Sequence, residues 1–188
     1  TAFELTRNNI TIPDGSGQPR PTGDQRSRGL EVETHMERAR LGASVTYSFT
    51  DGVLARFSEV GIVGFDPATF QPVQGVLDRS GNASPFAPRH LFSARARLDL
   101  GRGLLATVAF RVASEQFISE DNAFRIPSSS FLDAAFSYRR GKARISVIGD
   151  NLLDEKTFTR GYSPYSVLPV ATRRLSVRLD LWYDQKRP

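Results

Sequence analysis

Apolar and polar side chains alternate with a period of two along residues 174–183. One face of this segment carries aliphatic and aromatic residues, and the other carries arginine, serine and aspartate. Successive side chains of a β-strand point to opposite sides, so this period predicts an amphipathic strand. The apolar members are Leu175, Val177, Leu179, Leu181 and Tyr183.

The same alternation recurs along the rest of the chain. Clear copies cover residues 43–49 and 92–100, and the polar positions between their apolar residues carry serine, threonine, arginine and aspartate. Weaker copies lie at 30–33, 106–112, 132–138 and 143–147, with a ragged one near 2–8. Together with the last segment, these patterns predict about eight strands.

The predicted links between strands alternate in length. Short links cover 37–40, 100–103 and 139–142, and long links lie near 9–28, 52–88, 117–128 and 151–172. Up-and-down outer-membrane barrels have short periplasmic turns and long extracellular loops. A strand of about 10 residues, tilted near 45°, also spans roughly the 25 Å apolar band of such barrels. We therefore predict an all-β, antiparallel, up-and-down segment of a transmembrane β-barrel.

The polar faces carry charged residues in the middle of strands. Arg95, Arg97, Arg111, Arg144 and Arg178 all occupy such positions. In the dry core of a soluble sandwich, unpaired charges would cost several kcal/mol each, whereas a wet or plugged barrel lumen tolerates them. Two alternatives stay open: a soluble β-sandwich binding module, in which these faces meet solvent, and a self-contained eight-stranded outer-membrane barrel with a structural or adhesive role.

Composition narrows the class of protein further. The chain has 188 residues, a mean hydropathy of −0.32 and no apolar run near the roughly 18 residues of a membrane-spanning helix. A barrel strand turns only alternate residues to lipid, so the low hydropathy agrees with a barrel. The chain lacks cysteine, which excludes disulfides and thiolate chemistry. Its net charge is +5, but arginines mix with acids across many strands, which disfavours nucleic acid as a partner.

A resemblance to a known family covers nearly the whole chain and is most specific in its last fifth. The run Asn151-Leu152-Leu153-Asp154, followed by a basic residue and an aromatic, resembles the end of the penultimate strand in TonB-dependent receptors. Pro169 and Arg173 resemble the Pro-Arg step into the last strand of that family. These six residues have structural roles, since Asn and Asp cap turns and a proline at a strand start removes no ladder bond.

The resemblance implies that residues 1–188 are the C-terminal part of a receptor barrel, with the plug domain absent and about eight of roughly 22 strands present. It implies a cell outer membrane location in a Gram-negative bacterium. It also implies TonB-energised uptake of a nutrient, with a ferric siderophore as the commonest cargo. The expected partners are outer-membrane lipid, the TonB system acting through the missing plug, and the small-molecule ligand. The polar tail after Tyr183 departs from the family's usual aromatic ending.

Chemical motifs give few candidate site residues. His35 and His90 are far apart and accompany no nucleophile motif, so we predict no catalytic, cofactor-binding or metal-ligating residues. For the acidic residues after position 149, turn capping is favoured over calcium binding. Ligand contacts are expected in the extracellular loops, where arginine binds acid groups and tyrosine offers a stacking face. The candidates are Arg79, Arg160, Tyr162 and Tyr165.

Overall fold

The computed structural model describes residues 1–13, 19–163 and 166–183, which form strands, turns and irregular links. The described residues contain no helix long and apolar enough to cross a membrane. The strands are β1 (Ala2–Pro13), β2 (Pro19–Arg38), β3 (Leu41–Phe65), β4 (Pro72–Asp78), β5 (His90–Gly101), β6 (Leu104–Ala113), β7 (Gln116–Phe117), β8 (Arg125–Ile126), β9 (Ser129–Arg140), β10 (Ala143–Asp150), β11 (Phe158–Ser163), β12 (Ser166–Pro169) and β13 (Arg174–Leu181).

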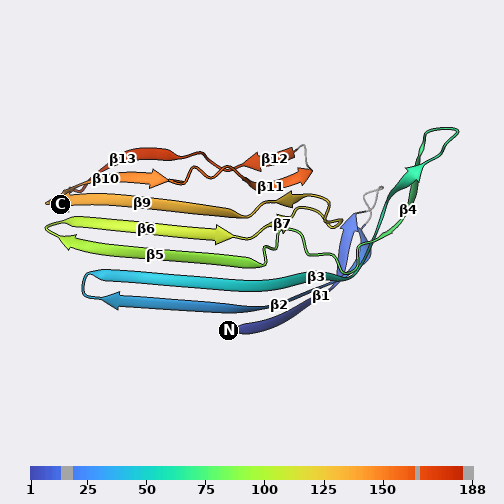
Figure 1. The fold of residues 1–188 in the computed structure, drawn as a ribbon, viewed down its shortest axis with the longest axis horizontal. Coiled ribbons are helices and arrows are strands. Elements are labelled where there is room, and N and C mark those ends of the chain that lie inside the picture. Colours follow the sequence, from blue (N-terminus) through green and yellow to red (C-terminus); the bar gives the residue numbers. More distant parts are fainter. Residues whose placement is uncertain (14–18, 164–165, 184–188) are drawn as a thin grey trace, which may run out of the picture.

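Eight of these strands form one antiparallel wall. They are hydrogen-bonded in the order β1-β2-β3-β5-β6-β9-β10-β13 (Figure 1). Among these eight, strands that are consecutive along the chain are therefore neighbours in the wall. The predicted up-and-down arrangement of about eight strands is therefore confirmed. Strands β1 and β13 lie at opposite edges, so the wall is open and does not form the closed eight-stranded barrel considered as an alternative.

Three tight turns join neighbouring strands at one end of the wall, as predicted. Each leaves two residues between its strands: β2 to β3, β5 to β6, and β9 to β10. Gly103 in the second turn has φ of +84°, and a Cβ there would lie 2.1 Å from the carbonyl oxygen of Arg139. Only glycine allows both that conformation and that approach, so Gly103 fixes the contact between adjacent turns.

Strand register places the alternating residues in rows on two faces. Val45 is paired with Thr34 and Ala94, and Val147 is paired with Phe136 and Val177. We call this side of the wall the apolar face. The residues between them form the polar face, where Ser146 pairs with Ser137 and Arg178. Within the described residues no second layer covers the wall, so many of its apolar side chains stay exposed.

Aromatic side chains mark the apolar face toward the long-link end. His90 lies 6.1 Å from Tyr47 and 5.4 Å from Phe49 between ring centroids, and its Nδ1 is 2.9 Å from the Tyr47 hydroxyl. Phe92 and Phe110 meet edge to face at 6.4 Å. Aromatic belts of this kind flank the apolar band of membrane barrels at the water interface.

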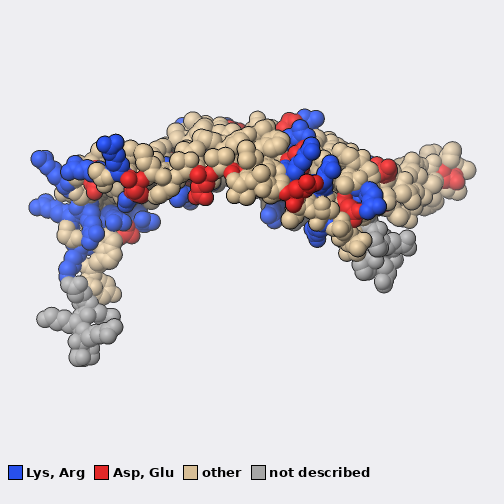
Figure 2. Space-filling view, turned by 90° about the horizontal axis from the view of Figure 1, so that it is seen from below, with Lys and Arg blue, Asp and Glu red and all other residues tan. Residues whose placement is uncertain are grey.

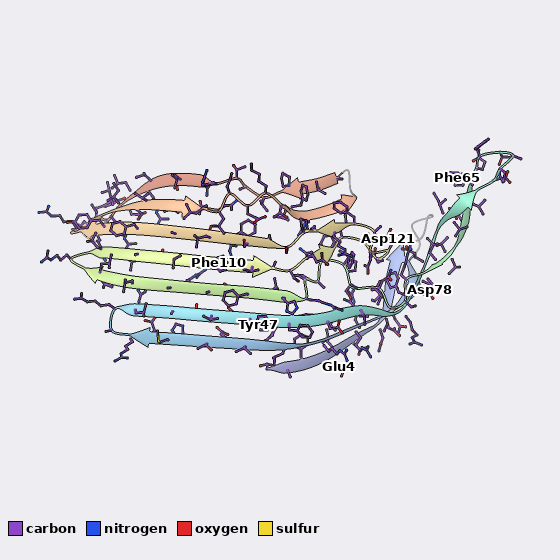
Figure 3. All side chains as sticks on the ribbon, in the orientation of Figure 1. Glu4, Tyr47, Phe65, Asp78, Phe110 and Asp121 are labelled. Carbon is purple, nitrogen blue, oxygen red and sulfur yellow. The ribbon has the colours of Figure 1, made fainter. Side chains whose placement is uncertain are left out.

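The long links are more regular than the sequence predicts. In the link expected at 9–28, β1 runs to Pro13 and β2 begins at Pro19. In the link at 52–88, β3 continues to Phe65 and pairs with β4, so a hairpin projects beyond the wall (Figure 3). Beyond the wall both faces of a strand meet water. Apolar and polar residues therefore need not alternate there, and the sequence gives no strand signal. Short hairpins β7–β8 and β11–β12 occupy the other two links.

The small buried core lies at the long-link end. Among the described residues, the buried hydrophobic side chains are Leu54 and Phe57 in the extension of β3 and Ile118 and Ile126 around the β7–β8 hairpin. Figure 2 shows the wall edge-on, with charged side chains at both ends and on the lower side, and an uncharged upper side over much of its length. The wall therefore has the polarity that a bilayer requires on one face.

Two adjacent residues of β3 test the assignment of faces. Val45 lies on the apolar face and is 42% exposed, while Thr46 lies on the polar face opposite Glu33. In the full-length protein in lipid vesicles, we expect Val45→Arg to lower the free energy of unfolding by roughly 2 to 4 kcal/mol, because it places a charge near mid-bilayer. The control Thr46→Arg should cost less than about 1 kcal/mol, since Glu33 faces it. Equal costs in urea titrations would contradict the assignment.

Candidate functional site

A hollow lies on the polar face, where a row of side chains crosses five strands. Register aligns Glu33, Thr46, Ser93, Arg111 and Phe131, one each from β2, β3, β5, β6 and β9. These residues line a cavity of about 800 Å³. The row runs from a carboxylate on β2 to a guanidinium on β6, so the hollow has an acidic and a basic end.

Arg111 forms the basic end and is held in place by two neighbours on β9. Its Nη2 donates to Oδ2 of Asp133 at 2.8 Å, and its guanidinium lies 5.6 Å from the ring centroid of Phe131. The Arg111 side chain is still 58% exposed. Stacking and ion pairing orient the guanidinium while leaving part of it open to solvent, where it can bind an acid group.

A second cavity of about 410 Å³ adjoins the first and shares Arg111 and Phe131 with it. Its lining continues along the polar face to Asp133, Asp150 and Asn151, where the wall meets the link after β10. The two hollows therefore form one continuous polar strip from the interior of the wall to its long-link end.

Asp133 connects the wall to this link. One carboxylate oxygen accepts from Arg111, and the other accepts from the backbone N–H of Asn151 at 2.8 Å. Asn151 is only 5% exposed and has φ of +48°. Its side-chain amide donates to the carbonyl oxygens of Glu155 and Ala171, each at 3.0 Å, and its Oδ1 accepts from the Glu155 N–H at 2.9 Å. Asn151 therefore ties together both ends of the 151–172 link.

Asp154 adds a second tie between the same ends. Its Oδ1 accepts from the backbone N–H of Arg173 at 3.2 Å, and its own N–H donates to the Asn151 carbonyl at 2.9 Å. Pro169 ends β12 and pairs with Phe158 at the open end of the β11–β12 hairpin. Leu152 donates its backbone N–H to the Leu132 carbonyl at 2.7 Å, while the Leu153 side chain is exposed. All six motif residues thus lie in or beside this one tied link.

The four predicted ligand contacts lie in two separate links. Arg79 follows β4, and its Nε donates to Glu59 at 2.9 Å, which fastens the base of the projecting hairpin. Arg160 is exposed on β11. Tyr162 belongs to β11 as backbone, but its side chain lies outside the described residues, as does Tyr165 entirely. The role of these four residues in ligand binding stays a prediction.

Carboxylates in the long links are held ionised by local donors. The guanidinium of Arg56, followed by the backbone N–H of Asn9, lowers the pKa of Asp24 below its ordinary value. The backbone N–H groups of Thr69 and Ala68 likewise lower the pKa of Asp66. A carboxyl group with a lowered folded-state pKa contributes stability above its ordinary pKa and loses it as the pH falls through the lowered value. The hairpins are therefore stabilised at neutral pH.

The side chains of the strip are suited to binding a polar molecule. Within the described parts of the chain, no group of three or more His, Asp or Glu side chains is arranged to hold a metal ion. Hydroxyls, carboxylates and one stacked guanidinium can solvate a hydrophilic molecule by hydrogen bonds. The sequence predicts Arg111 only as a mid-strand charge and does not single out Glu33 or Asp133, because their alignment depends on strand register.

A family model described as "TonB dependent receptor-like, beta-barrel" matches residues 1–152. The chain therefore belongs to the TonB-dependent receptor β-barrel family, as the motif at its end suggested. The search of curated proteins gives no match.

Solved structures of the same fold include three receptors. The chain is 17% identical to the siderophore receptor PiuA from Acinetobacter baumannii, with a TM-score of 0.76 over 95% of this chain and 24% of that one. It is 15% identical to the ferric-catecholate import receptor Fiu from K12 E. coli, with a TM-score of 0.73 over 96% and 24%. The ferric citrate transporter FecA gives 16% identity and a TM-score of 0.72 over 96% and 28%. The chain thus spans about a quarter of their length.

The tie at Asn151 can be tested without any ligand. We expect Asn151→Ala to expose the carbonyls of Glu155 and Ala171 and to cost about 1 to 3 kcal/mol, the usual penalty for buried polar groups left unpaired. In hydrogen exchange of the full-length protein, the amide of Glu155 should lose its protection. Leu153→Ala, in the same turn but 50% exposed, is the control and should leave the exchange of Glu155 unchanged. Unchanged protection in the Asn151 variant would contradict the tie.

Proposed function

We propose that this chain forms part of the barrel wall of an outer-membrane receptor that imports a ferric siderophore. Membership of the receptor family supports transport in place of enzymatic chemistry. Neighbours of the same fold are described as receptors or transporters for ferric siderophores, ferric catecholates and ferric citrate. The proposed location is the outer membrane of a Gram-negative bacterium, with lipid against the apolar face.

The polar strip gives this proposal its main structural support. Charged and hydroxyl side chains aligned across β2, β3, β5 and β6, with Phe131 on β9, would face the inside of the complete barrel. A hydrophilic iron complex needs such a surface on its way through a membrane, because burying it against apolar side chains would remove its hydration without replacement. The plug domain and the remaining strands would complete this lumen, and TonB would act on the plug from the periplasm.

Uptake of labelled cargo tests the proposal. Bacteria that produce the full-length parent protein should accumulate ⁵⁵Fe from ferric siderophores when starved of iron. Cells lacking TonB, with the same amount of receptor in the outer membrane, should show background accumulation only. Uptake that persists without TonB, or no uptake of any ferric siderophore in a panel of catecholates, hydroxamates and carboxylates, would overturn the assignment.

Arg160 is the proposed ligand contact best placed for a test. Its guanidinium is exposed on a long-link hairpin, whereas Arg79 is engaged by Glu59. For a siderophore identified by uptake, we expect Arg160→Gln to weaken binding about 10-fold to 100-fold, the worth of a charge-assisted hydrogen bond of about 1.5 to 3 kcal/mol. Lys156→Gln in the same link is the control and should bind normally. Equal affinity of the Arg160 variant and the parent would show that Arg160 does not contact the siderophore.

A further inference from the structure

The three tight turns concentrate positive charge at one end of the wall. Residues 38–41, 101–104 and 140–143 include the arginines Arg38, Arg40, Arg102 and Arg140, and they include no acidic residue. We call these four arginines the basic rim. The four arginines are exposed, and none of them has an ion-pair partner among the described residues.

Arginines at the opposite end of the wall are arranged differently. Arg28 and Arg89 both bind the carboxylate of Asp51, at 3.2 and 3.0 Å, and Arg174 binds Asp150 at 2.7 Å. Those three guanidinium groups each have a carboxylate partner within the chain, which Arg28 and Arg89 share. The rim arginines make no ion pair with the described residues, so their guanidinium groups are available to an anion supplied from outside.

Two members of the basic rim continue the apolar face. Arg38 lies two residues after Met36 on β2, and Arg140 lies two residues after Tyr138 on β9. A period of two places each arginine on the same face as the apolar residue before it. Both Met36 and Tyr138 are exposed on that face. The two guanidinium groups thus lie at the boundary of the apolar face, on the side that would meet lipid.

We propose that the basic rim binds the phosphate groups of anionic phospholipids in the leaflet at the tight-turn end. A long arginine side chain can keep its stem along the apolar surface while its guanidinium reaches the headgroup layer. Guanidinium pairs with phosphate through two parallel hydrogen bonds, and basic residues beside a membrane surface attract anionic lipids. An acidic protein would not need arginines in line with apolar columns, so the lipid is the occupant that fits.

This inference rests on the proposed membrane location, and lipid binding by the full-length protein tests it. The probe is fluorescent phosphatidylglycerol in detergent micelles, compared with phosphatidylcholine and with inorganic phosphate as competitor. We expect Arg38→Gln combined with Arg140→Gln to weaken phosphatidylglycerol binding about 10-fold. Phosphatidylcholine binding should not change, and phosphate should not compete. Competition by millimolar phosphate would mean a free-anion site and would overturn the lipid assignment.

The matched control removes the same charge from the polar face of β5. Arg95→Gln combined with Arg97→Gln should bind phosphatidylglycerol as the parent does, because both side chains project to the opposite face. Equal losses in both double variants, or no loss in the rim variant, would overturn the proposal. Heat-modifiable mobility in gels verifies that each variant is folded. A rim variant that binds lipid normally and still imports iron defeats this inference alone, whereas absence from the outer membrane defeats the proposed function as well.

Discussion

Every backbone N–H and C=O group inside a bilayer needs a hydrogen-bond partner, and the structure of this wall depends on that requirement. The interior strands meet it through antiparallel ladders on both sides. Only the outer edges of β1 and β13 lack a neighbouring strand in the described wall. Exposed to lipid, those edges would cost several kcal/mol for each unpaired group, so further strands must complete the barrel. A chain that covers about a quarter of PiuA or Fiu agrees with that requirement.

The hydrogen-bonded sheet is a single layer that separates the apolar face from the polar face. Register places Val45 and its row on the apolar face and aligns Thr46 with Glu33 and Arg111 on the polar face. Asp133 then links the polar face to the long-link end, because one carboxylate holds both the Arg111 guanidinium and the Asn151 backbone. The motif at residues 151–154 therefore positions the mouth of the polar strip while contributing no chemistry of its own.

The sequence predicts the wall better than the links, for a physical reason. Inside a bilayer, one face of a barrel strand meets lipid and the other meets water. This explains the alternation of apolar and polar residues at 43–49 and 92–100. Outside the bilayer both faces meet water, and β3 continues to Phe65 with Val60, Ile62 and Val63 exposed regardless of parity. Partners such as Glu59 for Arg79 depend on hairpin register and could not be predicted from the sequence. The Asn151 turn was predicted from side-chain capping, but its contact with Ala171 requires the folded link.

If one face of the wall contacts lipid and the other contacts water, the accessibility of side chains along β3 will alternate. The chain has no cysteine, so single cysteines can be introduced at each position from 43 to 49 in the full-length protein, after removal of any elsewhere. Spin labels there, in lipid vesicles, report collisions with oxygen and with a water-soluble nickel complex. The account predicts a period of two, with oxygen favoured at Ala43, Val45 and Tyr47. Equal access to the nickel complex at adjacent positions would contradict it.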